Sequence, residues 1–401
     1  MSRTSPRFAM LLAAVSLSVR SAFAAGPPPA LQFVETFPIE TTLDNADIPD
    51  AHAVWLEMIA AAKSSLDFAE FYASNEPGSR LEPIVKAVEA AAARGVRVRF
   101  LAEPRFYRTY PETQDRLARA AGITVRRAAG LPAGGVLHAK YFIVDGREAF
   151  IGSQNFDWRS LTHIQELGMR IRVPGVVGAL GEIFATDWAR AGNEPAPEPG
   201  RHVFPEKVIQ DGDTLAVSFV ASPKSLVPDS LWELPRLTAL VDSARETVRV
   251  QLLTYRAAGR DSTYFRELET ALRAAAARGV HVQLLLADWC KRAGTIEGLQ
   301  SLEPLPNVEV KLVTIPPWSG GFVPFGRVIH AKYLVVDARR FWVGTSNWER
   351  DYFYNSRNVG VIVESPTLAR RLDRFFTDNW NRPYATAVDP CAHYQPPRIS
   401  E

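Results

Sequence analysis

The chain has 401 residues, 47% of them hydrophobic and 22% charged, and its formal net charge is +2. This composition supports one large or two medium globular domains and excludes a disordered or low-complexity chain. The near-neutral charge also excludes a basic surface over the whole molecule, so any contact with nucleic acid would have to be local.

The N-terminal segment differs from the rest of the chain. Arg3 and Arg7 precede the apolar run FAMLLAAVSLSV, and SAFAAG follows with small residues at the spacing that a signal peptidase accepts. We therefore expect residues 1–24 to be a signal peptide cleaved near Ala24, and the protein to be exported to the periplasm or secreted. An uncleaved anchor is the alternative, because Arg20 interrupts the pattern. The remaining sequence contains no apolar run of the roughly 18 residues that cross a bilayer.

The first half predicts helices alternating with strands. The segment MIAAAKSSLDFAEFYAS, which begins at Met58, predicts a helix and then a strand. In AVEAAAARGVRVRFLAE (87–103), Ala-rich helix formers end at Arg-Gly and an alternating β-branched run follows, which predicts a helix, a glycine cap and a strand. HAKYFIVDGREAFIGSQN (138–155) then predicts two short strands joined by a turn.

The second half repeats this order. LVDSARETVRVQLLTYRA and ALRAAAARGVHVQLLLAD (271–288) match the first two segments, and HAKYLVVDARRFWVGTSN (330–347) matches the histidine motif. The hexapeptide AAARGV recurs at an offset of 184 residues and the histidine motif at 192, so about eight residues have been gained between them. Three ordered matches indicate an internal duplication.

Between the copies lies RAGNEPAPEPGRHVFPEK (190–207), which is rich in Pro and Gly and is not expected to sustain helix or sheet. We predict two lobes, 30–195 and 213–395, joined by a linker at 196–212. Alternating elements favour an α/β fold, with helices covering the sheet of each lobe. Two similar lobes would pack most economically about a pseudo-twofold axis, which brings equivalent loops together at one site.

Each motif places polar groups at strand ends. His138 and Lys140 lie on one side of an extended run because side chains alternate along a strand, and the second copy repeats this with His330 and Lys332. Further polar residues follow at matched spacings in the two copies: Asp145, Ser153 and Asn155 in the first, and Asp337, Thr345 and Asn347 in the second.

This set of side chains suits a phosphate. Lysine, hydroxyl and carboxamide donors bind nonbridging oxygens, and two histidines facing each other supply a nucleophile and a general acid. We therefore predict a phosphohistidine mechanism without a cofactor or metal, because the motifs offer no acidic cluster of the kind that two-metal nucleases use. Asp145 and Asp337 belong to the motifs, but their positions before turns favour a structural role.

The motifs HxKx4D and G[ST]xN, present in both copies, resemble the signature of the phospholipase D superfamily. The resemblance extends from about residue 54 to 380. NFDWRSLTHIQELGMRI and TSNWERDYF resemble the branch that contains the mammalian lysosomal phospholipase D-like 5′ exonucleases and related poxvirus envelope proteins. The chain departs from some members of that branch by keeping Asp337. The resemblance implies two phospholipase D-like α/β/α lobes and a metal-independent phosphodiesterase.

The resemblance also implies a polar residue eleven positions after each motif Asn that orients the catalytic histidine. These residues are Glu166 and Asn358. We expect the Glu166 carboxylate beside His138, where it would favour the imidazolium form, and the Asn358 amide beside His330. His138 would then be the general acid and base and His330 the nucleophile, although other members of the superfamily use the reverse assignment.

Three functions remain open. A nuclease acting on single-stranded nucleic acid is favoured by the resemblance; a phospholipase D or transphosphatidylase, and a non-catalytic protein that binds phosphodiesters, are the alternatives. A basic, aromatic groove would indicate nucleic acid and a hydrophobic rim lipid. The phosphodiester substrate is the expected partner, with no stable protein partner evident, and one chain carries both motifs, so a complete site needs no dimer.

Other residues gave weaker predictions. Trp158 and Trp348 are expected in the core, with base stacking as the alternative. Four arginines among aromatic residues either border the cleft or belong to a solvated loop and helix: Arg105, Arg108, Arg126 and Arg127. The loop IPPWSGGFVPFGRV precedes His330 and is expected at the rim of the site. Cys290 and Cys391 form one disulfide or remain unpaired.

Overall fold

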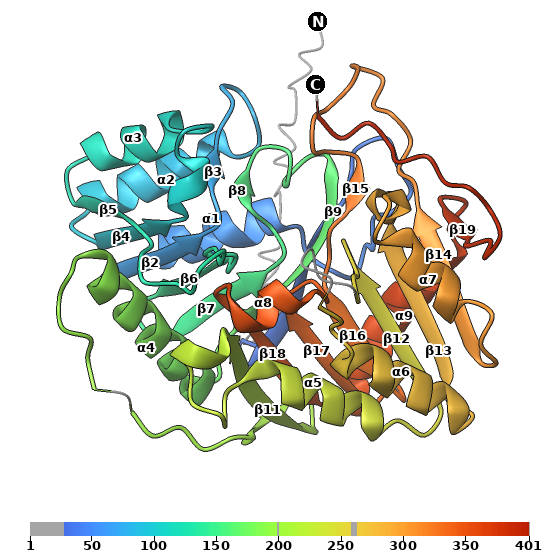
Figure 1. The fold of residues 1–401 in the computed structure, drawn as a ribbon. Helices are drawn as coiled ribbons and strands as arrows, with labels where there is room; N and C mark the ends of the chain where they lie inside the picture. Colours follow the sequence, from blue (N-terminus) through green and yellow to red (C-terminus); the bar gives the residue numbers. More distant parts are fainter. Residues whose placement is uncertain (1–27, 199, 258–262, 401) are drawn as a thin grey trace, which may run out of the picture.

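The computed structural model describes residues 28–198, 200–257 and 263–400, so the expected signal peptide lies outside the described residues. The chain folds into two halves that lie side by side, each built on one large sheet with helices against it (Figure 1). In the part of the chain that the structure describes, no helix is long and apolar enough to cross a membrane.

Each half contributes one sheet, and the two sheets share a strand order. The first has eight strands in the order β1 (Leu31–Thr36), β9 (Ile164–Ile171), β7 (Glu148–Gly152), β6 (Tyr141–Val144), β2 (Ser65–Glu70), β4 (Arg97–Ala102) and β5 (Ile123–Arg127), with β15 (Val328–Ile329) added to β9. The second has nine strands in the order β10 (Glu206–Gln210), β11 (Asp213–Ser222), β18 (Asn358–Glu364), β17 (Arg340–Gly344), β16 (Tyr333–Val336), β12 (Thr247–Leu252), β13 (His281–Ala287), β14 (Val308–Val313) and β19 (Ala385–Ala387). Matched strands therefore occupy matched positions, which confirms the duplicated α/β fold.

Helices alternate with these strands along the chain. They are α1 (Ala51–Ala61), α2 (Glu82–Ala93), α3 (Glu112–Arg119), α4 (Pro174–Ala191), α5 (Glu233–Asp242), α6 (Glu267–Ala277), α7 (Ile296–Leu302), α8 (Arg350–Tyr354) and α9 (Pro366–Asn381). The Asp50 carboxylate caps α1 by accepting from the His52 N–H. Gly95 and Gly279, which follow α2 and α6, have φ values of 92° and 88°, a conformation that glycine adopts at little cost.

Alternation along the motif strands divides the core into layers. Tyr141 and Tyr333 point into a central apolar cluster that both sheets share with α4 and α9. Phe142, the next residue of β6, faces an outer cluster with α1 and α2, and Leu334 of β16 faces a second outer cluster with α5 and α6. Because both faces of these strands are buried, their register is strongly specified, and this fixes where the motif side chains emerge.

The prediction that residues 190–207 sustain neither helix nor sheet is partly wrong. Residues 206–210 form β10, which pairs antiparallel with β11 at the edge of the second sheet, although this segment was not expected to sustain a sheet. The turn between them is Asp211-Gly212, with φ values of 52° and 77°. This dipeptide is a strong hairpin signal, because both residues of a type I′ turn need positive φ.

Candidate active site

The two motif segments each cross to the other half of the molecule. The His138 N–H donates to the carbonyl of Arg357 at 3.0 Å, and the His330 N–H donates to the carbonyl of Gln165 at 2.7 Å. The segment before His330 forms β15, which pairs with β9 of the first sheet. Because of this reciprocal exchange, His330 lies against β9 of the first half, and His138 lies beside the start of β18 of the second half.

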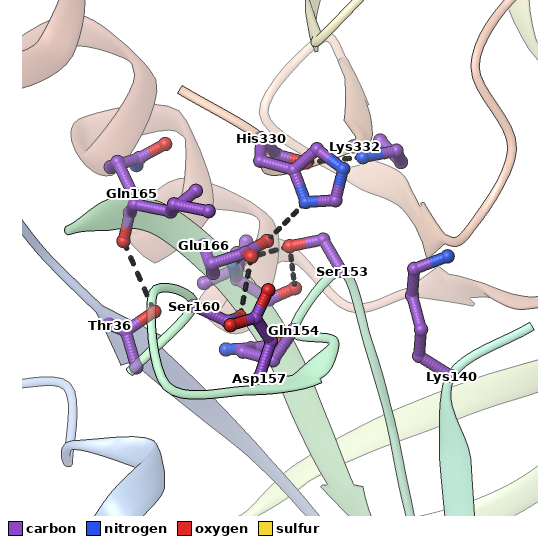
Figure 2. Close-up of polar contacts among 12 residues, drawn as sticks. Thr36, Lys140, Ser153, Gln154, Asp157, Ser160, Gln165, Glu166, His330 and Lys332 are labelled. Atoms are coloured by element: carbon purple, nitrogen blue, oxygen red, sulfur yellow. Dashed lines mark hydrogen bonds and ion pairs between the residues drawn. The ribbon is translucent and has the colours of Figure 1, made fainter. Parts of the chain in front are cut away.

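The ring of His330 is held by a buried acid from the first half. Its Nδ1 lies 2.7 Å from Glu166 Oε2, while Glu166 Oε1 accepts from the Ser160 hydroxyl at 2.7 Å. Figure 2 shows Glu166 between the His330 ring and Ser160. Burial raises the pKa of Glu166 to about 7, and the Lys332 ammonium opposes this rise. Burial lowers the pKa of the His330 imidazole, and Lys332 and Lys140 lower it further, so a proton shared by this pair favours the carboxyl group.

The ring of His138 is held by a neutral amide from the second half. Its Nδ1 lies 3.0 Å from Asn358 Oδ1. Asn358 Nδ2 donates to the carbonyls of Tyr352 and Ser356 at 2.8 and 3.3 Å, so the amide oxygen must be the atom that faces the ring. The oxygen can only accept; His138 Nδ1 is therefore the protonated nitrogen, and Nε2 is left with its lone pair.

The structure reverses the expected pairing of the orienting residues. Glu166 was predicted beside His138 and Asn358 beside His330, but Glu166 contacts His330 and Asn358 contacts His138. The prediction assumed that each orienting residue serves the histidine of its own half. It is wrong because the motif segments cross over, which removes the basis for assigning the nucleophile to His330.

Two buried lysines complete the site. Lys140 and Lys332 are both 0% exposed, and each ammonium donates to the carbonyl of the histidine two residues earlier. Burial lowers the pKa of Lys332 to about 7. The pKa of His138 is lowered by burial first, and then by Lys140, Lys332 and His330. Groups from both motifs thus act on one another in a single site, as the sequence predicted.

The predicted hydroxyls brace the strands that carry the orienting residues. The Ser153 hydroxyl accepts from the Leu167 N–H at 3.1 Å, and the Thr345 hydroxyl donates to Asn358 Oδ1 at 3.0 Å. The predicted carboxamides differ from each other. Asn347 accepts from the Thr254 N–H and donates to Tyr352, whereas the buried Oδ1 of Asn155 has no hydrogen-bond partner among the described residues. Phosphate binding by these four side chains stays a prediction.

The motif aspartates lie at the far ends of the motif strands. Asp145 follows β6 and accepts from the backbone N–H groups of Lys63, Ser64 and Ser65 at 3.0, 2.7 and 2.9 Å. Asp337 does the same at the end of β16, where its partners are the N–H groups of Arg245, Glu246 and Thr247. These contacts support the structural role that the positions before turns favoured, because each carboxylate anchors the start of a neighbouring strand.

Asp145→Ala should lower the free energy of unfolding by about 1–3 kcal/mol at pH 7 while leaving kcat within about threefold. Several backbone N–H groups lower the pKa of Asp145 to about 2. A depressed pKa in the folded state means that the stabilisation is present above the unfolded value and is lost as pH falls from about 4 toward 2. Denaturant titrations at pH 7 and pH 2.5 measure it. A large loss of kcat in folded protein would contradict this structural role.

Aromatic residues that the sequence analysis did not single out line the site beside His138. The rings of Phe71 and Tyr352 each lie 4.8 Å from the His138 ring. The Phe71 ring also contacts Tyr72 and Phe106, and Tyr72 contacts Tyr110. We name these four residues the aromatic wall. The available signal was the FY pair at the end of β2, next to the motif strand.

The weaker sequence predictions have mixed outcomes. Trp348 is fully buried in the core, as expected, and Trp158 is half-buried. Arg126 pairs with Glu194 and lies over the Trp188 ring. Cys290 and Cys391 are both free in the described part of the chain, the first buried and the second exposed. No cluster of three or more His, Cys, Asp or Glu side chains that could hold a metal occurs among residues 28–198, 200–257 and 263–400.

Comparison with known proteins identifies the family. The family model described as "Cardiolipin synthase, PLD-like domain" matches twice, at residues 55–188 and 237–380. "Phospholipase D Z" of Dictyostelium discoideum is 29% identical over 387 residues, which cover 90% of this chain and 91% of that protein. "5'-3' exonuclease PLD4" of Mus musculus is 32% identical over 377 residues, which cover 84% of this chain and 74% of that protein.

A solved structure supports the same fold. The phosphatidylserine synthase of Haemophilus influenzae superposes with a TM-score of 0.61, covering 84% of this chain and 85% of that chain at 11% identity. The chain therefore belongs to the PLD-like domain family of the phospholipase D superfamily. It is a phosphodiesterase with two PLD-like halves, as the paired motifs predicted.

Proposed function

We propose that the protein is an exported nuclease that hydrolyses single-stranded nucleic acid through a phosphohistidine on His138, with His330 as general acid and base. The observation that carries the assignment is the unequal pair of hydrogen bonds at the two Nδ1 atoms. His138 Nδ1 faces an amide oxygen, and His330 Nδ1 faces a carboxyl group. The two histidines therefore differ in whether the group that faces Nδ1 can itself carry a proton.

His138 is suited to attack phosphorus. Asn358 holds hydrogen on Nδ1, which leaves the lone pair of Nε2 free to form the P–N bond. Burial and the two lysines lower the pKa of His138, which keeps the ring neutral at neutral pH. As the P–N bond forms, the bond from phosphorus to the leaving oxygen breaks, and the lysine ammonium groups stabilise the charge on the nonbridging oxygens.

His330 is suited to protonate the leaving oxygen. While the Glu166–His330 pair holds a proton, His330 Nε2 carries hydrogen in both arrangements, whether the shared proton lies on Glu166 or on Nδ1. Nε2 donates its proton to the leaving oxygen. In the second step it takes a proton from water, whose oxygen attacks phosphorus and breaks the P–N bond. His138 is regenerated neutral and His330 is again protonated.

Single-stranded nucleic acid suits the surroundings of His138. The aromatic wall lies beside this histidine, and the Arg159 guanidinium stacks on Tyr110 of the wall at 5.2 Å. Exposed bases bind to aromatic faces without sequence preference, and arginine adds cation–π contacts. Similarity to the 5'-3' exonuclease PLD4 over most of both chains supports a nucleic-acid substrate.

A phospholipid substrate is the second candidate. It is favoured by two exposed aromatic residues, Phe322 and Phe325, which lie 45% and 43% exposed in the loop before His330. A hydrophobic rim of this kind suits a membrane surface. Similarity to phospholipase D Z over 91% of that protein supports this alternative.

Incubation of the protein, lacking residues 1–24, with a 5′-hydroxyl single-stranded oligonucleotide in EDTA tests the proposal. We expect product ladders, no loss of activity in EDTA, and much slower cleavage of a duplex of the same sequence, because a paired base cannot stack on the wall. Phosphatidylcholine vesicles form the second arm of the experiment. Turnover of the vesicles without cleavage of the oligonucleotide would contradict the nuclease and support the phospholipase.

A further inference from the structure

A further buried acid lies beside the site, outside the motifs. Glu70 is the last residue of β2 and is 1% exposed. Its Oε2 atom is buried and has no hydrogen-bond partner among the described residues. Buried polar atoms without a partner are rare in folded proteins and call for a specific explanation.

The strand register places Glu70 opposite Lys140. In the antiparallel pair of β2 and β6, Ala69 lies opposite Tyr141, so the next position sets Glu70 across from Lys140. Side chains at directly opposed positions have Cβ atoms about 5 Å apart. The second half repeats the geometry without the acid: Gln251 lies opposite Tyr333 in the pair of β12 and β16, so Leu252 is across from Lys332.

The first half has an acid opposite its motif lysine and the second half does not. The orienting residues show the opposite distribution, because the acid contacts His330 and the amide contacts His138. Lys332 shares its site with Glu166, the acid bound to His330. The residue bound to His138 is the neutral Asn358, which provides no charge for Lys140. Glu70 supplies an acid on that side. Each lysine is therefore matched by one carboxyl group, although the two carboxyl groups come from different positions in the fold.

We propose that Glu70 is a positioning residue of the reaction, whose carboxylate acts across the strand pair to keep the Lys140 ammonium charged and directed at the substrate phosphate. This inference rests on the proposed binding of phosphate by the lysines and not on the choice of nucleic acid over lipid. The Lys140 ammonium donates to the His138 carbonyl and lies 4.7 Å from the Phe71 ring, so its position is also fixed by neighbours of the nucleophile.

The electrostatic balance at Lys140 supports this role. Burial lowers the pKa of Lys140, and Lys332 lowers it further, while Glu70 and then Glu166 oppose the fall. His138 is the other titratable group against Lys140. Burial raises the pKa of Glu70, and Lys140 opposes that rise. Removing Glu70 therefore favours the neutral amine, so Lys140 loses its proton at lower pH than in the wild type.

The test is the pH profile of kcat/KM for Glu70→Gln and Glu70→Leu, measured with bis(p-nitrophenyl) phosphate. Leucine reproduces what the second half carries at the matched position, so the fold accommodates it there. We expect the basic limb of the profile to move to lower pH by about 1 unit or more, the usual effect of one nearby opposite charge. Glu70→Asp should restore most of the wild-type profile.

Glu103→Gln is the matched control. Glu103 is also a buried acid, adjoins the end of β4, and accepts from the N–H groups of Leu137 and Arg105 without facing a motif lysine. It should change the height of the profile and leave the basic limb in place. The proposal would be overturned if the basic limb of the kcat/KM profile stayed in place in folded Glu70→Gln and Glu70→Leu. An equal shift of this limb in Glu103→Gln would also overturn it. The small diester keeps this outcome separate from any failure to cleave nucleic acid.

Discussion

Alanine at either His138 or His330 should lower turnover of a simple alkyl phosphodiester by about 10⁴-fold or more, because the nucleophile and the general acid act in the same step. The two variants should differ once the leaving group is activated. p-Nitrophenolate leaves without protonation, so His330→Ala should still form the phosphohistidine and release one equivalent of nitrophenol in a burst. His138→Ala has no nucleophile and should show no burst.

Rapid-quench measurements followed by mapping of the phosphorylated peptide distinguish the roles directly. A phosphorylated peptide containing His138 in the His330→Ala variant is the expected result. A burst in His138→Ala with phosphate on His330 would reverse the assignment. His281→Ala is a suitable control, because this histidine lies on β13, is partly exposed and pairs with Glu309. It should leave both the burst and the steady-state rate unchanged.

Local patterns in the sequence predicted most of the fold. Helices that end at Arg-Gly and continue into alternating β-branched runs need only short-range physics, and α2–β4 and α6–β13 formed as expected. The duplication then predicted that two motifs would meet in one site. The β10–β11 hairpin was missed because the Pro-rich composition outweighed Asp211-Gly212, a signal that was present in the sequence.

The contacts inside the site depend on long-range pairing, which one sequence does not specify. Glu166 reaches His330 because β15 pairs with β9. Val328 and Ile164, which face each other in this pair, are 164 positions apart in the sequence. No local pattern distinguishes this crossing from an arrangement in which each half serves itself. Glu70 was overlooked for the same reason, since its importance comes from the β2–β6 register and not from any motif.

Stability and activity should be coupled most strongly at Arg357, the residue that precedes Asn358. Its side chain is 0% exposed and donates to both carboxylate oxygens of Asp187 on α4 at 2.7 and 2.8 Å, and to the Ser222 carbonyl at 2.7 Å. Arg357→Ala removes both hydrogen bonds of the buried Asp187 carboxylate to arginine and leaves it only Arg190 at 3.5 Å. We therefore expect the free energy of unfolding to fall by about 3–5 kcal/mol. Denaturant titration measures the loss.

The backbone of Arg357 links this ion pair to catalysis. Its N–H donates to the Val136 carbonyl at 2.9 Å and its carbonyl accepts from the His138 N–H at 3.0 Å. A displaced Arg357 would therefore shift the His138 segment, and we expect kcat/KM to fall by about tenfold or more.

A double-mutant cycle with Asp187→Ala separates loss of the pair from the cost of a lone buried charge. The double variant should lose less stability than the sum of the single variants, because the buried carboxylate that lost its main partner is then absent. Arg371→Ala breaks the more exposed pair with Asp47, and there we expect a change below about 1 kcal/mol. Equal losses of unfolding free energy in Arg357→Ala and Arg371→Ala would contradict the larger contribution expected of the buried Arg357–Asp187 pair. A stable but inactive Arg357→Ala variant would place its importance in the His138 segment alone.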